Sequence, residues 1–310
     1  MRIPALAPLL AVLAAGACAS QGTTTDRGGG PAPQPDHDWS AVAAALRAEG
    51  RLLPDGTYRV DVPRKDPSLR NEFGFVVPPS MVLTYAAFAG SPGDATVMGD
   101  TCALGEEVNP VVDALRAGDV EVVAVHNHML GGEPNFVFVH FQGRGDALAL
   151  ASTVRSAWDQ LGRPHPQPRR ELLPPPALDT AELRQIMRLA GATTPDGTYK
   201  VALARPRLAT TLDGRPIPGG MGPACWVGFA PCECGSTMIM GDTCVLRGEL
   251  QSVIDGYRRN GIRIVAIHNH SIGTVPELVF CHFAAEGDAA TLARAVRSVW
   301  DGLEPPEQGR

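Results

Sequence analysis

The chain contains two copies of one sequence unit, and this internal repeat constrains its fold more than any other feature. Residues 98–159 align with residues 240–301 without a gap, and half of the aligned positions are identical. A second pair of segments, residues 38–59 and residues 179–200, aligns as well. Repetition on this scale predicts two copies of one fold rather than two unrelated domains.

Domain boundaries follow from the repeat. We predict a first unit over residues 38–161 and a second unit over residues 178–304, joined by a Pro-rich linker over residues 162–177. Each unit has the pattern β-α-β-β-α, preceded by a helix and further strands. We expect an α+β fold, with a mixed or antiparallel sheet of ferredoxin-like character covered by helices, and a pseudo-two-fold relation between the units.

Composition excludes several classes of protein. The 310 residues are 44% hydrophobic and 19% charged, which is typical of a globular protein and not of a disordered chain. The net charge of −6 argues against binding to nucleic acid. An aromatic content of 5% argues against a carbohydrate groove lined with aromatic rings.

The first residues are typical of an export signal. Residues 1–18 contain a short apolar run that ends in small residues before Cys18, as in a bacterial lipobox. We predict that Cys18 is lipidated and anchors the protein to a membrane of the cell envelope, with residues 19–37 as a flexible tether. Ordinary secretion after cleavage near Ala17 or Ala19 is the alternative, and it would give a soluble secreted or periplasmic protein.

Six of the eight histidines form two matching triplets, and they carry the functional prediction. Each triplet is His-Asn-His followed twelve residues later by a third histidine: His126, His128 and His140, then His268, His270 and His282. Side chains alternate along a strand, so the first two members of a triplet share a face. Pairing His126 opposite His140 in a hairpin would bring the three imidazoles within reach of one ion.

Three histidines suit a divalent transition metal and leave a position for water or substrate. Zinc is the first expectation, and iron, manganese, nickel and copper also fit. We expect one such site in each unit. A buried polar network and a metal-free acid/base site are the alternatives.

A glutamate recurs at the start of one helix in each unit, as Glu107 and Glu249. Acidic residues favour helix starts for electrostatic reasons alone. Glu107 and Glu249 are also candidates for a fourth ligand, for a hydrogen-bond acceptor of a ligating imidazole, or for a catalytic general base acting on metal-bound water.

Other repeated residues have structural interpretations. We expect Asp100 and Asp242 to end strands, in capping or turn roles, with metal ligation as the alternative. Asn127 and Asn269 should point away from the histidines. We further expect Asp146 and Asp288 to cap helices, and Trp158 and Trp300 to lie in the core. We also expect a disulfide from Cys225 to either Cys232 or Cys234. The alternatives for the cysteines are a bridge between Cys102 and Cys244, and thiolate ligation by Cys232 and Cys234.

The motifs Met98-Gly-Asp, Glu107-Val-Asn-Pro, His126-Asn-His-Met and His140-Phe resemble the LppY/LpqO family of bacterial lipoproteins and exported proteins. The resemblance covers both units and implies export and surface anchoring, without an established activity. The first unit is closer to the family pattern, since Met129 and Glu133 become Ser271 and Val275 in the second.

Three functions follow as hypotheses. The first is an exported, lipid-anchored metal-binding protein. The second is a metal-dependent hydrolase that uses Glu107 or Glu249 as a general base. The third is a non-catalytic structural or partner-binding module. The sequence names neither a small-molecule nor a protein partner.

Overall fold

A computed structural model describes residues 37–64, 66, 68–162, 177–205, 208–232 and 235–303. Cys18, all of the tether except His37, and most of the Pro-rich linker therefore lie outside the described residues. The elements of the first half are, in chain order, α1 (Ser40–Leu46), β1 (Gly50–Leu52), β2 (Tyr58–Pro63), β3 (Arg70–Asn71), η1 (Pro79–Met81), β4 (Leu83–Ser91), β5 (Asp94–Leu104), η2 (Gly105–Glu107), α2 (Val108–Ala117), β6 (Glu121–His126), β7 (Gly132–Glu133), β8 (Phe136–Gly145) and α3 (Ala147–Trp158).

The second half repeats this order almost element for element. It contains α4 (Thr180–Met187), β9 (Gly191–Thr193), β10 (Tyr199–Ala204), β11 (Thr211–Leu212), β12 (Arg215–Pro216), η3 (Gly219–Met221), β13 (Ala224–Pro231), β14 (Thr237–Leu246), α5 (Leu250–Arg259), β15 (Arg263–Asn269), β16 (Thr274–Val275), β17 (Leu278–Gly287) and α6 (Ala289–Asp301).

Each half forms a six-stranded sheet. The strand order is β1-β2-β4-β5-β8-β6 in the first half and β9-β10-β13-β14-β17-β15 in the second. Neighbouring strands pair antiparallel throughout both sheets. The prediction of an α+β fold in two tandem units is confirmed.

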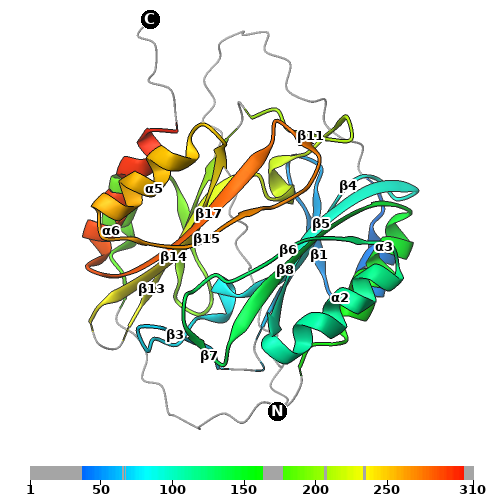
Figure 1. Cartoon of the computed structure of the whole chain (residues 1–310), viewed down its shortest axis with the longest axis horizontal. Coiled ribbons are helices and arrows are strands. Elements are labelled where there is room, and N and C mark those ends of the chain that lie inside the picture. Colours follow the sequence, from blue (N-terminus) through cyan, green and yellow to red (C-terminus); the bar gives the residue numbers. More distant parts are fainter. Residues whose placement is uncertain are drawn as a thin grey trace, which may run out of the picture.

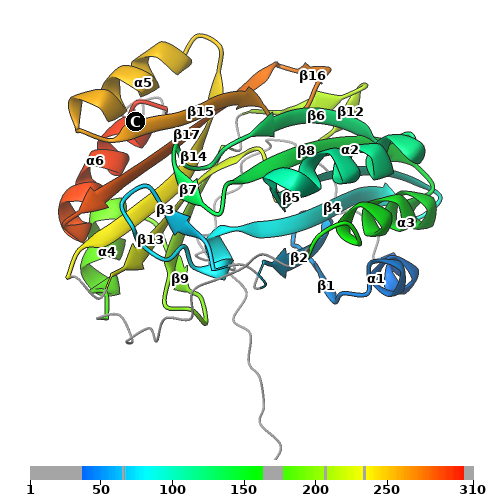
Figure 2. The same ribbon diagram turned by 60° about the horizontal axis from the view of Figure 1, so that its bottom comes forward.

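The layers run helices, sheet, sheet, helices. Figure 1 shows α2 and α3 on one flank and α5 and α6 on the other, with the two sheets between them. Figure 2 shows that α1 lies beside α3 and that α4 lies beside α6. One apolar core fills the space between each sheet and its own helices. A further core combines residues of both halves, among them Phe138 and Met240, and therefore lies between the sheets.

Local sequence explains the ends of the helices. The Asp146 side chain accepts a hydrogen bond of 2.9 Å from the Ala149 N–H, and Asp288 accepts one of 2.8 Å from the Thr291 N–H. Both aspartates cap a helix, as predicted. Trp158 and Trp300 are buried in the two helix-side cores, also as predicted.

Reciprocal contacts hold the halves together. The Asp55 carboxylate accepts a hydrogen bond of 2.7 Å from the Gly220 N–H, and Asp196 accepts one of 2.8 Å from the Ser80 N–H. Each aspartate belongs to the Pro-Asp-Gly turn of one half and contacts the short 3-10 helix of the other. This equivalence supports the predicted pseudo-two-fold relation, which brings equivalent strands of both halves to one interface.

Candidate functional site

The strand β5 and its counterpart β14 place an aspartate on the face between the sheets. Both strands continue beyond this aspartate, to Leu104 and Leu246, so Asp100 and Asp242 lie within strands. The expectation that they end strands, as caps or turns, is wrong. The preceding glycines are needed for space, because a Cβ at Gly99 would lie 2.2 Å from the Phe141 ring.

A neighbouring strand adds the third histidine of each triplet. His140 on β8 pairs with Asp100 on one side and with Ala124 on the other, and His126 pairs with Phe138. The second half repeats this register, with His268 opposite Phe280. The predicted pairing of His126 with His140 is therefore wrong by two residues. A shift of two preserves the face of a strand, so the histidines still share the predicted face.

The two triplets form one cluster between the sheets, and the expectation of a separate site in each unit is corrected. The ring centroids of His126 and His268, from different halves, are 3.7 Å apart. His282 of the second half lies 5.0 Å from His126 and 3.9 Å from His128, ring centroid to ring centroid. We call the six histidines with Asp100 and Asp242 the histidine cluster.

Three overlapping groups within the cluster could hold a metal ion. In each group the ligand atoms lie within 4.8 Å of one another: His126, His128 and His282; His126, His140 and His268; and Asp242, His268 and His282. Two of the three groups draw ligands from both halves, because the pseudo-two-fold relation places equivalent strands face to face.

Burial controls the charge of the cluster. It lowers the pKa of all six imidazoles, to about 4 for His268 and about 3 for His270. Burial also raises the pKa of Asp100 and Asp242. The imidazoles are therefore neutral at pH 7 and their lone pairs are available to a metal ion.

The carboxylates lie close to imidazoles without hydrogen bonding to them. Asp242 Oδ2 is 3.5 Å from His282 Nε2, and Asp100 Oδ2 is 3.6 Å from His140 Nε2 and 3.9 Å from His128 Nε2. These separations are too long for hydrogen bonds. The sequence analysis favoured capping or turn roles over ligation for both aspartates, although their retention in both copies was a signal for the site.

Tyr85 on β4 adds a contact between the halves that the sequence did not suggest. Its hydroxyl Oη and His270 Nε2 share a hydrogen bond of 3.0 Å. The Arg59 guanidinium lies over the Tyr85 ring, 3.8 Å from its centroid. The equivalent position in the second half is Trp226, so the repeat gave no conserved signal here.

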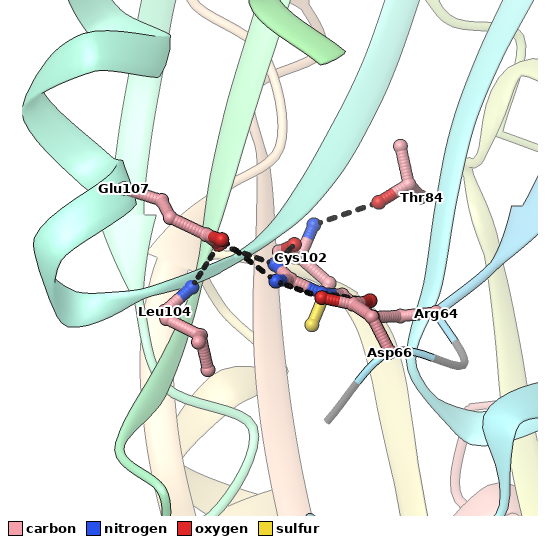
Figure 3. Close-up of polar contacts among 6 residues, drawn as sticks. All are labelled: Arg64, Asp66, Thr84, Cys102, Leu104 and Glu107. Carbon is pink, nitrogen blue, oxygen red and sulfur yellow. Dashed lines mark hydrogen bonds and ion pairs between the residues drawn. The ribbon is translucent and has the colours of Figure 1, made fainter. Parts of the chain in front are cut away.

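Glu107 and Glu249 lie outside the three close groups of ligand atoms. Two hydrogen bonds join the buried Glu107 carboxylate to the Arg64 guanidinium, with N···O distances of 2.5 and 2.8 Å (Figure 3). The Leu104 N–H also donates to Glu107. In the second half, Arg205 and the Leu246 N–H bind Glu249 in the same way. Both glutamates thus join a helix start to an arginine.

The cysteines differ from the predicted disulfide. Cys225 is a buried free thiol, as are Cys102, Cys244 and Cys281. Cys232 is disulfide-bonded, and Cys234 lies outside the described residues. The predicted bridge from Cys225 is wrong, and the alternative bridge between Cys102 and Cys244 is absent.

In the part of the chain that the structure describes, no helix is long and apolar enough to cross a membrane.

Comparison with known proteins gives a family and distant structural likenesses. A family described as Domain of Unknown Function (DUF1259) matches residues 40–160 and 181–302. No curated protein matches the chain.

Among solved structures, the chain is similar to the fused permuted hexameric shell protein MSM0275 from the RMM microcompartment, with 15% identity, 83% of this chain and 97% of that chain covered, and a TM-score of 0.18. It is also similar to EtuB from Clostridium kluyveri, with 8% identity, 79% and 86% covered, and a TM-score of 0.18. TM-scores this low support no conclusion about function.

The metal-free protein should lose stability as the pH falls from 7 towards 5. An unfolded histidine binds a proton near pH 6.5, whereas the folded imidazoles stay neutral to about pH 4 for His268 and about pH 3 for His270. The unfolded chain then binds more protons, so acid favours it. Asp100 and Asp242 act in the opposite direction, but two carboxyls offset only part of six imidazoles.

Urea unfolding in the presence of a chelator tests this expectation, with midpoints measured at pH 7 and pH 5. An equal or higher midpoint at pH 5 would contradict it. The variant His282→Phe serves as a control, because it should show a shallower dependence on pH.

Glu107→Gln should destabilise the fold without changing metal content. Removing one charge from a buried ion pair costs about 3–5 kcal/mol. Glu249→Gln should cost less, since the Glu249 side chain is 25% exposed whereas that of Glu107 is fully buried. Denaturant unfolding measures the loss, and elemental analysis measures the metal. Loss of metal at unchanged stability would instead assign the glutamate to a metal site.

Proposed function

Because the chain belongs to the family described as Domain of Unknown Function (DUF1259), whose description names no activity, we propose a function from its own residues. The protein binds a divalent transition-metal ion at a centre shared by its two halves. His126 and His128 of the first half and His282 of the second half are the principal ligands. We call this set site A.

The observation that carries the proposal is the state of the ring nitrogens. Both nitrogens of His126 and of His128, together with Nε2 of His282, are buried and have no hydrogen-bond partner in the described part of the chain. A buried polar group without a partner costs about 1–3 kcal/mol. Three neutral imidazoles that converge within 4.8 Å offer their lone pairs to one ion, which compensates for part of this cost.

Asp242 lies close to one ligand of site A, His282, and forms its own close group of ligand atoms with His268 and His282. Two ligands of a tetrahedral ion at about 2.1 Å each lie about 3.4 Å apart, given the usual zinc–nitrogen and zinc–oxygen distances. Asp242 Oδ2 and His282 Nε2 are separated by 3.5 Å. Burial raises the pKa of the Asp242 carboxyl, and a bound cation would favour its ionised form.

The ligand types favour a metal ion that is intermediate between hard and soft. Imidazole suits zinc, copper, iron and nickel, and a carboxylate admits manganese. Zinc remains the first assignment because three histidines are a set of ligands that binds zinc in proteins.

The carboxylates considered for catalysis are already bound elsewhere in the fold. The hydrolase alternative assigned the general base to Glu107 or Glu249, and each of these carboxylates already binds an arginine. We therefore propose metal binding as the function and assign no reaction.

We further propose that the protein is exported and held at a membrane by lipidated Cys18, as in the LppY/LpqO lipoproteins. The support is the sequence of residues 1–18, in which an apolar run and small residues precede Cys18. The histidine cluster would then lie in the cell envelope.

Protein purified without chelator should contain metal. His128→Ala and His282→Ala should each lower the affinity of site A by at least tenfold, since each removes one ligand. His37→Ala is the matched control, because His37 lies beside Trp39 and outside the cluster. Elemental analysis and competition with a chromogenic chelator measure the effect. Metal-free wild-type protein, and wild-type behaviour in both variants, would contradict the proposal.

Cys18→Ser should move the protein from the membrane fraction to the soluble fraction, because it removes the thiol that accepts the lipid. Cys281→Ser is the control, since Cys281 is a buried free thiol of the second half. Fractionation of a bacterial host, together with labelling by a clickable fatty acid, gives the readout. Labelling that persists in Cys18→Ser would reject this site of lipidation.

A further inference from the structure

The pseudo-two-fold relation between the halves gives site A an equivalent set of residues. Each member of site A has an equivalent in the other half, which gives His268, His270 and His140, with Asp100 in the place of Asp242. We propose that this second set, site B, binds a second divalent transition-metal ion and that Tyr85 controls its affinity by holding His270. This inference rests on the proposed metal-binding function.

Two ring separations in site A have close equivalents in site B. The ring centroids of His282 and His126 are 5.0 Å apart in site A, and those of His140 and His268 are 5.0 Å apart in site B. The corresponding distances to the second histidine are 3.9 Å for His128 and 4.3 Å for His270.

The carboxylates are equivalent as well. Asp100 Oδ2 lies 3.6 Å from His140 Nε2 in site B, close to the 3.5 Å between Asp242 and His282 in site A. The Nε2 atoms of His140 and His268, like Asp100 Oδ1, are buried and have no hydrogen-bond partner in the described residues. Site B therefore contains its own unpartnered donors.

The two sites differ at His270. In site A the nitrogens of His128 have no partner, whereas His270 Nε2 is bound to the Tyr85 hydroxyl at 3.0 Å. The ligand atoms of His140, His268 and His270 do not form a group within 4.8 Å. Tyr85 thus holds His270 away from the other two ligands of site B.

Tyr85 is itself fixed in position. Arg59 lies over its ring, donates a hydrogen bond of 2.8 Å to Asp61 and donates another of 3.1 Å to the Gly220 carbonyl. The equivalent residue Trp226 lies under Lys200, and its indole can donate but cannot accept a hydrogen bond. The asymmetry between tyrosine and tryptophan therefore makes site B the weaker site.

Titration of the metal-free, full-length protein with Zn²⁺ alone tests the inference. Wild-type protein should bind one tight ion and one weaker ion. Tyr85→Phe should tighten the second ion by about threefold to tenfold, the effect of releasing an imidazole from one neutral hydrogen bond. Trp226→Phe is the matched control and should leave the second affinity unchanged.

A second variant keeps the test independent of Tyr85. His270→Ala should abolish the second ion and retain the first. A single ion in both wild-type and Tyr85→Phe protein would overturn site B, and so would two ions in His270→Ala. Weaker or unchanged second binding in Tyr85→Phe would overturn the role of Tyr85. Absence of any ion from the wild type would overturn the proposed function itself, which distinguishes the two failures.

Discussion

The burial of six imidazoles and two carboxyls between two sheets is the constraint on which the rest of the structure depends. The apolar residues that surround the cluster, such as Phe138, exclude water and keep the imidazoles neutral. Neutral imidazoles without partners destabilise a fold unless something binds their lone pairs. The same burial that makes the cluster costly therefore prepares it for a metal ion.

Duplication of the unit explains how one cluster arises from two copies. Each copy presents its histidines on the face of the sheet that its own helices do not cover. Two such faces must cover each other to exclude water, and reciprocal bonds from Asp55 and Asp196 fix their relative position. A centre built in this way uses ligands from both halves. It also admits differences between the halves, as Tyr85 and Trp226 show.

Much of the fold followed from the sequence because it rests on local rules. Caps at Asp146 and Asp288, buried tryptophans and alternating strands were predictable from spacing. The shared face of His126, His128 and His140 was predictable too, even though the register was not. The register between β6 and β8 depends on the irregularity between Val122 and Ala124, which no residue pattern predicted.

Only part of the candidate site could be predicted from the sequence. Spacing within one unit cannot reveal how two sheets face each other, so the joint cluster was missed. Asp100 was expected to end a strand, whereas β5 continues past it to Leu104 and Gly99 makes room for a phenylalanine ring. Glu107 was retained in both copies for its bonds to an arginine and to a helix start, and sequence alone did not separate this role from ligation.

The central claim is that one ion is held by both halves of the chain. Anomalous diffraction from crystals of zinc-loaded protein, recorded at the zinc edge, tests it most directly. The account predicts a peak about 2.0–2.2 Å from nitrogens of His126 and His128 and of His282. A peak bound only by histidines of one half, or by residues outside the histidine cluster, would contradict it.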